Sequence, residues 1–227
     1  MTTVRVSKNY NNLRNKKVLI TAGPTREHWD PVRFLSNASS GQMGVALALE
    51  AARLGADVTL ILGPIPGAAP RRRKNLRVVR VVGAMDLDAK VREHLSGTQV
   101  FVGAAAVADY RPAVILRQKI KEKPASVQLK LLRNPDIIAK VAKRGPNRPS
   151  VVIGFALETE DVLENAAAKL RRKGLDWIVA NRETNMGAPE GSATLMSRWG
   201  ERISIARMTK ERLAKKIWKA LLDRPAL

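Results

Sequence analysis

The sequence contains no cysteine, only two histidines (His28 and His94) and 4% aromatic residues. The absence of cysteine excludes thiol nucleophiles, disulfides, iron–sulfur clusters and cysteine-ligated zinc, and two histidines leave little room for a histidine-rich metal site. No apolar run approaches the roughly 18 residues of a transmembrane helix, and the basic N-terminus lacks the apolar segment of a secretory signal. We therefore expect a cytoplasmic protein with no membrane contact and with an aliphatic core.

Positive charge is abundant. The 227 residues include 41 Lys and Arg against 20 Asp and Glu, which gives a formal net charge of +21. The densest basic runs are residues 71–80, 119–123 and 210–219. Charge of this size fits a solvated surface, a nucleic-acid partner or small phosphorylated ligands.

Apolar segments that end at glycine or proline alternate with segments of helical period. Such repeated strand–helix–strand units predict an α/β fold, a Rossmann-like and mostly parallel sheet with helices on both faces. The sequence predicts strands at 16–23, 57–62, 76–82, 99–103, 151–155 and 176–180, and helices at 41–56, 84–95, 135–143, 160–173 and 209–222.

Two further segments indicate a small antiparallel edge or subdomain. Residues 194–198 and 202–205 flank Trp199-Gly200 as a hairpin would, and residues 127–132 alternate like a strand with one solvated face. We expect residues 104–126 to be irregular. No internal linker is evident, so we predict a basic N-terminal arm (1–15) followed by a single domain (16–227).

Ligands of such folds bind at the carboxyl ends of the parallel strands. After the first strand, residues 36–44 (SNASSGQMG) offer glycine and serine before a helix, which suits an anion. The ordinary alternative is a helix capped by Ser39 or Ser40. After the strand at 99–103, Asp109 follows a run of small residues and could hold Mg²⁺, accept from a ligand hydroxyl or be merely solvated.

Two lysine groups add to these candidate sites. Lys119, Lys121 and Lys123 form either a solvated run or a lid that delivers ammonium groups to phosphates. Lys169 and Lys173 lie four residues apart on one helix face, where like charges repel weakly unless an anion offsets them. This spacing is consistent with a phosphate clamp near Phe155.

Six motifs in this order resemble phosphopantothenate–cysteine ligases, the ligase half of bacterial bifunctional decarboxylase/synthetases of coenzyme A biosynthesis. The resemblance covers about Lys17 to Leu222 and rests on the segments ITAGPTRE…DPVRFLSNASSGQMG, GAAAVADYRP, KIKEK, RNPDI, GFALET and KLRRKGLDWIVAN. It implies that CTP activates the carboxylate of 4′-phosphopantothenate to an acyl-cytidylate, and that the amine of cysteine then displaces CMP. Fixed cations, backbone N–H groups and Mg²⁺ would stabilise the phosphate charge.

The resemblance also implies residue roles. Asn37 and Lys119 would be catalytic, Asn37 by stabilising the acyl-nucleotide and Lys119 from a mobile loop. Arg33 and Asn37 would contact substrate, and Asp109 the metal. The residues implied for the nucleotide are Gly103, Ala104, Ala105, Asp109, Lys119, Asn134, Pro135, Asp136, Ile137, Phe155, Lys169 and Lys173.

The flavin decarboxylase half is missing, so the chain is either a stand-alone ligase or one half, and a separate decarboxylase is a possible partner. Its lysine loop reads KIKEK where the bacterial pattern commonly runs KIKK. The family implies a homodimer whose subunits share active-site edges. An NAD(P)-dependent oxidoreductase is disfavoured because no GxGxxG follows the first strand. A nucleic-acid-binding protein is disfavoured because few aromatics are present for base stacking.

Overall fold

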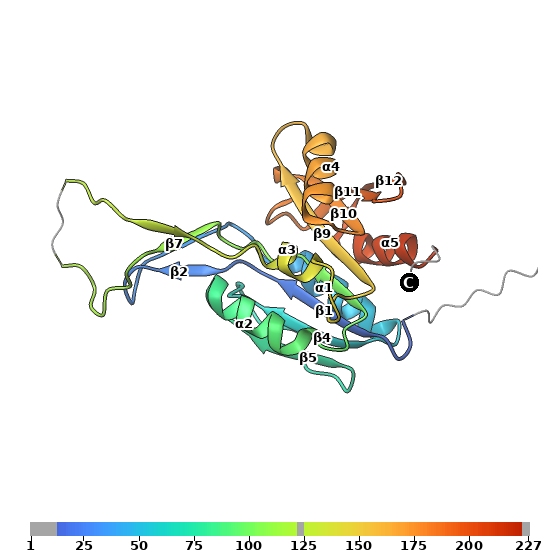
Figure 1. Ribbon diagram of the computed structural model, residues 1–227, viewed down its shortest axis with the longest axis horizontal. Helices are drawn as coiled ribbons and strands as arrows, with labels where there is room; N and C mark the ends of the chain where they lie inside the picture. Colours follow the sequence, from blue (N-terminus) through green and yellow to red (C-terminus); the bar gives the residue numbers. More distant parts are fainter. Residues whose placement is uncertain (1–12, 122–124, 224–227) are drawn as a thin grey trace, which may run out of the picture.

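The computed structural model describes residues 13–121 and 125–223 (Figure 1). An eight-stranded sheet runs through it in the order β12-β11-β10-β9-β6-β1-β4-β5. The six strands β10, β9, β6, β1, β4 and β5 are parallel. Strands β11 and β12 extend the sheet antiparallel at one edge. Their bounds are β1 Lys17–Ala22, β4 Asp57–Leu62, β5 Leu76–Arg80, β6 Val100–Gly103, β9 Val151–Glu158, β10 Trp177–Arg182, β11 Glu190–Ser197 and β12 Arg202–Thr209.

Helices cover both faces of the sheet. One apolar cluster joins Val18 and Ile20 of β1 to α1 and α5, and a second joins Leu19 to α2, α3 and α4. Successive strand residues thus point to opposite faces, and both faces are buried, which explains the near-continuous apolar runs of the parallel strands. The helices are α1 Gln42–Arg53, α2 Ala84–Leu95, α3 Ile137–Ala142, α4 Val162–Lys173 and α5 Lys210–Leu222, with a short 3₁₀ helix η1 at Glu183–Asn185.

The predicted fold class is confirmed, and so is the hairpin around Trp199-Gly200, where β11 pairs with β12. The alternative considered for the start of α1, a cap by Ser39 or Ser40, is wrong. Gly41 is the N-cap residue, with φ 72°. A Cβ on Gly41 would lie 2.5 Å from Ile65 Cγ2, so only glycine fits this turn.

Two hairpins that the sequence analysis did not predict extend beyond the carboxyl edge of the sheet (Figure 1). In one, β2 (Arg26–His28) pairs with β3 (Phe34–Ser36); in the other, β7 (Tyr110–Pro112) pairs with β8 (Leu131–Arg133). We call residues 26–36, 110–121 and 125–133 the two-hairpin extension. The backbone N–H of Leu116 donates to Trp29 O at 2.8 Å, so the hairpins lie against each other.

The prediction of a half-buried strand at 127–132 is wrong. Only Leu131 and Leu132 of that segment belong to β8, and the whole segment is exposed. Its alternation has the period of a strand, but no described element covers its apolar side. Of the predicted N-terminal arm, residues 1–12 lie outside the described residues, and Leu13 is buried in the core; the domain boundaries stay a prediction.

Candidate nucleotide site

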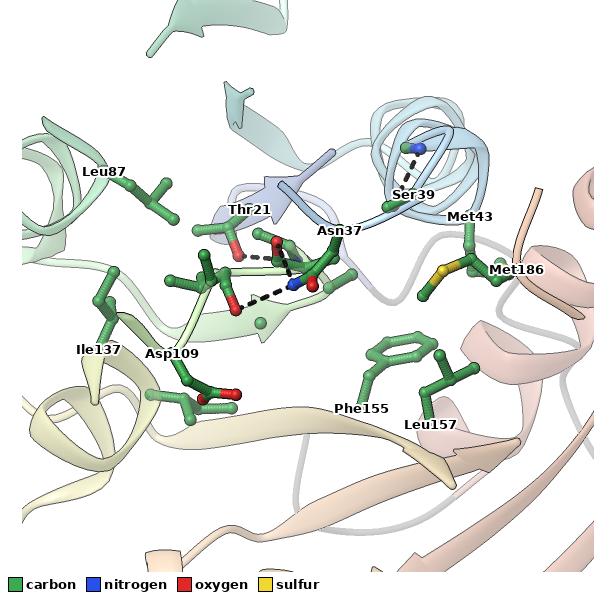
Figure 2. Close-up of a pocket in the computed structure, with 18 of the residues that line it drawn as sticks. Thr21, Asn37, Ser39, Met43, Leu87, Asp109, Ile137, Phe155, Leu157 and Met186 are labelled. Atoms are coloured by element: carbon green, nitrogen blue, oxygen red, sulfur yellow. Dashed lines mark hydrogen bonds between the residues drawn. The ribbon is translucent and has the colours of Figure 1, made fainter. Parts of the chain in front are cut away.

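A cleft of about 740 Å³ opens where β1, β6, β9 and β10 end (Figure 2). Its volume lies within the usual range of small-molecule sites, roughly 300–1,000 Å³. Most of the site residues implied by the motif resemblance line it. They are Asn37, Gly103, Ala104, Ala105, Asp109, Asn134, Pro135, Asp136, Ile137, Phe155, Lys169 and Lys173.

Backbone hydrogen bonds fix the small-residue loop 104–109 at the base of this cleft. Ala104 N donates to Thr21 O at 3.1 Å, and Ala105 N donates to Thr21 Oγ1 at 3.3 Å. At the far end of the loop, Asn134 Nδ2 donates to Ala108 O at 2.8 Å. The loop has no bulky side chains, so a ligand can approach a backbone whose position is already set.

Asn37 lies above this loop, with its side-chain nitrogen directed toward the backbone (Figure 2). Asn37 Nδ2 donates to Ala106 O and to Val107 O, both at 3.2 Å. These bonds use both amide hydrogens and leave Oδ1 as an acceptor. Asn37 therefore positions the loop and can accept a hydrogen bond from a ligand N–H or O–H.

The N-terminus of α1 contributes a second polar wall. Gly41, Gln42 and Met43 line the cleft together with Ser39, whose Oγ accepts from Gly41 N at 3.3 Å. The first N–H groups of a helix have no partner within the helix and carry a partial positive charge. This wall suits an anion, as the sequence around residues 36–44 indicated.

Charged groups from α3 and α4 form the opposite wall. Lys173 Nζ lies 2.9 Å from Asp136 Oδ2, while Asp136 Oδ1 also accepts from Ala139 N as the N-cap of α3. Burial acts to raise the pKa of Asp136, but these two hydrogen bonds and the positive charge of the lysines hold it below its ordinary value. Asp136 is therefore ionised and bound to Lys173 at neutral pH.

Lys169 differs from Lys173 because no carboxylate pairs with it in the described part of the chain. Burial lowers the pKa of Lys169, and the charge of Lys173 lowers it further. Its ammonium group is thus partly desolvated at the cleft, and the negative charges of Glu158 and Asp136 offset this only in part. An anionic ligand would offset the free-energy cost of this desolvation. A partly desolvated lysine in a cleft is the arrangement expected of a phosphate-binding lysine.

An apolar patch occupies the remaining part of the cleft. Phe155 and Leu157 from β9 lie near Met186, and Met43 projects from α1 toward them (Figure 2). This patch can hold an uncharged part of a ligand, next to the cations of α4.

Two of the predicted site residues do not line this cleft. Lys119 is exposed on the two-hairpin extension. Arg33 donates from Nη2 to Ile120 O at 3.3 Å and lies 3.7 Å from Asp30 Oδ2. Lys121 is also exposed, and Lys123 lies outside the described residues.

The described residues offer few carboxylates for the expected Mg²⁺. Within residues 13–121 and 125–223, no group of three or more His, Asp and Glu side chains is arranged to hold a metal. Asp109 is an exposed carboxylate at the cleft, whereas Asp136 forms an ion pair with Lys173. These residues fit a magnesium ion that arrives with nucleotide phosphates and takes one carboxylate from the protein, a common mode for Mg²⁺.

The sequence analysis missed the wall formed by β10 and the segment after it. Asn181 and Asn185 line the cleft with Met186 and Gly187, and the Oδ1 atom of Asn181 is buried without a hydrogen-bond partner. The available signal was the strand 176–180, whose carboxyl end points to the same edge as the others. Thr21, at the end of the first strand, was missed in the same way.

The described helices include none long and apolar enough to cross a membrane.

Residues 13–224 match the family described as DNA/pantothenate metabolism flavoprotein C-terminal domain. The coenzyme A biosynthesis bifunctional protein CoaBC of Vibrio cholerae is 47% identical over 171 residues, which are 74% of this chain and 42% of that protein. The Escherichia coli K12 protein of the same name is 47% identical over 174 residues, 75% of this chain and 42% of that protein. The chain thus spans less than half the length of these relatives.

Solved structures agree with the sequence matches. The crystal structure of the C-terminal domain of a CoaBC protein superposes with a TM-score of 0.78 at 38% identity, covering 94% of this chain and 97% of that one. A DNA/pantothenate metabolism flavoprotein from Streptococcus pneumoniae superposes with a TM-score of 0.77 at 24% identity, covering 92% and 99%, which shows a shared fold. These findings agree with the resemblance read from the motifs: the chain belongs to the family of DNA/pantothenate metabolism flavoprotein C-terminal domains, and it matches the C-terminal domain of CoaBC.

Proposed function

We propose that this chain is a phosphopantothenate–cysteine ligase that uses CTP. The observation that carries the proposal is the pairing, in one cleft, of a fixed small-residue backbone loop with the partly desolvated ammonium group of Lys169. A backbone loop recognises a nucleotide by shape and N–H groups, and the cation balances its phosphates. The relatives named for coenzyme A biosynthesis support the choice of substrates.

The reaction has two steps. The carboxylate of 4′-phosphopantothenate attacks the α-phosphorus of CTP, the bond to the β-phosphate breaks, and pyrophosphate leaves. The amine of cysteine then attacks the acyl carbon of the acyl-cytidylate, and CMP leaves with a proton released to solvent or base. Negative charge moves between phosphate oxygens in both steps, so preorganised cations and N–H donors are the groups that accelerate them.

The chain's own residues divide this work. The N-terminus of α1 and Lys169 bind phosphate oxygens, and Lys173 is held in place by Asp136. Asn37 keeps the 106–107 backbone in position and presents Oδ1 to the amine or amide of the bound substrate. Magnesium, when bound, would neutralise phosphate charge, and Asp109 is the residue that would contact it.

We propose that the chain works as a homodimer. In this dimer, Lys119 and Arg33 would act from the two-hairpin extension of one subunit on the cleft of the other. Apolar side chains are exposed along the extension, among them Val32, Val114, Ile115, Val127 and Leu131, at 42–68% exposure. A second copy covering them would remove this surface from water. The same contact would bring Lys119 and Arg33 to the edge of the partner's cleft.

The proposal is tested by incubation with 4′-phosphopantothenate, cysteine, Mg²⁺ and either CTP or ATP. Pyrophosphate and CMP should form in equal amounts, together with phosphopantothenoylcysteine. Release of CDP and phosphate instead would contradict nucleotidyl activation. ATP in place of CTP tests the nucleotide preference, and NADPH should neither bind nor react.

The product of the proposed reaction, phosphopantothenoylcysteine, would be the substrate of a decarboxylase. A separate flavin-dependent decarboxylase remains a proposed partner, because the relatives are named as bifunctional proteins of coenzyme A biosynthesis. Pull-down of such an enzyme, or faster conversion of product when the two are mixed, would support that partnership.

A further inference from the structure

A second cleft, separate from the candidate nucleotide site, lies on the other side of α4. Its volume is about 530 Å³. Helix α4 separates the two clefts because Lys169, Arg172 and Lys173 face the first, whereas Ala167, Leu170 and Arg171 face the second. The two groups of positions lie on opposite sides of a helix of 3.6 residues per turn. We call this second space the arginine cleft.

Arginines from several separate elements converge on the arginine cleft. Arg144 and Arg148 follow α3, and Arg171 lies on α4; Arg198 lies in the turn after β11, and Arg202 begins β12. Glu201 is the one carboxylate residue among its lining residues in the described part of the chain. Arg171 alone could be explained by the C-terminal end of the α4 dipole, but the other four come from outside that helix.

Asp176 organises two of these arginines. Its Oδ2 accepts from Arg148 Nη2 at 2.7 Å, and its Oδ1 accepts from Arg198 Nη1 at 3.2 Å. Arg148 also donates to the carbonyl oxygens of Ala142 and Pro149, so its guanidinium is structural. One carboxylate thus balances two guanidinium groups, and the local charge stays positive.

The remaining three arginines are not among the ion-pair partners of Asp176. Arg144, Arg171 and Arg202 are all exposed. Arginine forms paired hydrogen bonds to phosphate oxygens and is more weakly hydrated than lysine, so three of them around one cleft form a phosphate-binding arrangement. Below them, Leu170, Leu175 and Met196 provide an apolar floor.

From this arrangement we infer that the arginine cleft binds an organic phosphate carrying two or more phosphate groups. The phosphates contact Arg144, Arg171 and Arg202, and the carbon skeleton of the ligand lies on Leu170, Leu175 and Met196. The site is distinct from the proposed ligase chemistry, because none of these residues lines the first cleft. A bound ligand would touch the helix that carries Lys169 and Lys173.

The test measures binding of ADP by titration calorimetry at about 0.15 M salt, where screening suppresses weak long-range attraction. The parent protein carries Lys169→Gln and Lys173→Gln, which weaken phosphate binding in the first cleft. Into this parent we introduce Arg144→Gln with Arg171→Gln. The matched control is Arg71→Gln with Arg72→Gln, which removes the same charge from an exposed loop elsewhere.

The cleft variant should bind ADP about tenfold more weakly than the parent, because two charged hydrogen-bond donors are lost. The control should change the affinity less than twofold. Equal weakening in both variants, or no ADP binding by the parent, would overturn the inference. Inorganic pyrophosphate should bind more weakly than ADP, and equal affinities would contradict a role for the apolar floor. Unchanged thermal melting of the variants shows that they fold.

Discussion

The candidate nucleotide site and the two-hairpin extension differ in how they are held. In the cleft, the loop 104–109 is fixed by hydrogen bonds to β1, to Asn37 and to Asn134. In the extension, Lys119 and Arg33, which we propose as site residues, lie on a projecting pair of hairpins with exposed apolar side chains. The cleft is preorganised for binding, whereas under the proposed function the extension needs a contact with a second copy before its residues can act.

The largest expected effect comes from breaking that further contact. Ile115→Asp combined with Leu131→Asp places two charges on the exposed apolar face of the extension, where burial by a second copy would then be costly. We expect a dimer to become a monomer in sedimentation equilibrium, with ligase activity reduced at least about 100-fold because Lys119 loses its site. Met85→Asp, an exposed apolar residue on α2, is the matched control and should leave both properties unchanged. A dimer that survives the double substitution would place the subunit contact elsewhere.

Lys119→Gln isolates the charge of one residue on the extension. We expect kcat to fall about 100-fold or more, as when a single group that stabilises developing charge is removed. The melting temperature should hardly move, because an exposed charge contributes little to folding. Lys121→Gln should be milder, and equal, minor losses for the two variants would identify a merely solvated charge run.

A mixing experiment sharpens this result. If Lys119 completes the partner's cleft, Lys119→Gln and Asn37→Asp subunits form mixed dimers with one intact site. Random exchange should then restore about a quarter of the wild-type rate. No recovery after exchange would show that Lys119 acts within its own subunit.

Asn37→Asp tests the preorganised side of the comparison. The carboxylate would face the carbonyl oxygens of Ala106 and Val107, to which the amide now donates at 3.2 Å. Two hydrogen bonds become repulsions, and a negative charge is placed beside the phosphates. We expect turnover to fall about tenfold to 100-fold with the fold retained, and acyl-cytidylate to accumulate if the second step suffers more. Unchanged turnover would remove Asn37 from the site.

The parts predicted from the sequence are those fixed by local pattern and burial. Strands such as Val18–Leu19–Ile20 are apolar because both faces of the sheet are covered, so the parallel order follows from their alternation with helices. The cleft residues could be predicted because they lie at the ends of strands or within the recognised motifs, as Asp109 and Phe155 do. The hairpins β2–β3 and β7–β8 were missed because their strands have three residues each, which is too short for an alternating pattern to stand out. Their pairing depends on tertiary contacts such as Leu116 N to Trp29 O, which no local pattern indicates.

The smallest expected effect concerns Lys169, whose pKa is lowered by burial and by the charge of Lys173. Bound phosphates favour the charged form and raise that pKa again, so nucleotide binding takes up a proton wherever free Lys169 is partly neutral. The affinity for CTP should therefore weaken severalfold as the pH rises from about 7.5, where the phosphates are fully ionised, to about 10. Lys169→Arg keeps a positive charge throughout this range and should flatten the dependence, measured by calorimetric titration at each pH. An equal slope in the wild type and in Lys169→Arg would assign the titration to another group, and would leave Lys169 as a cation of ordinary pKa in the cleft.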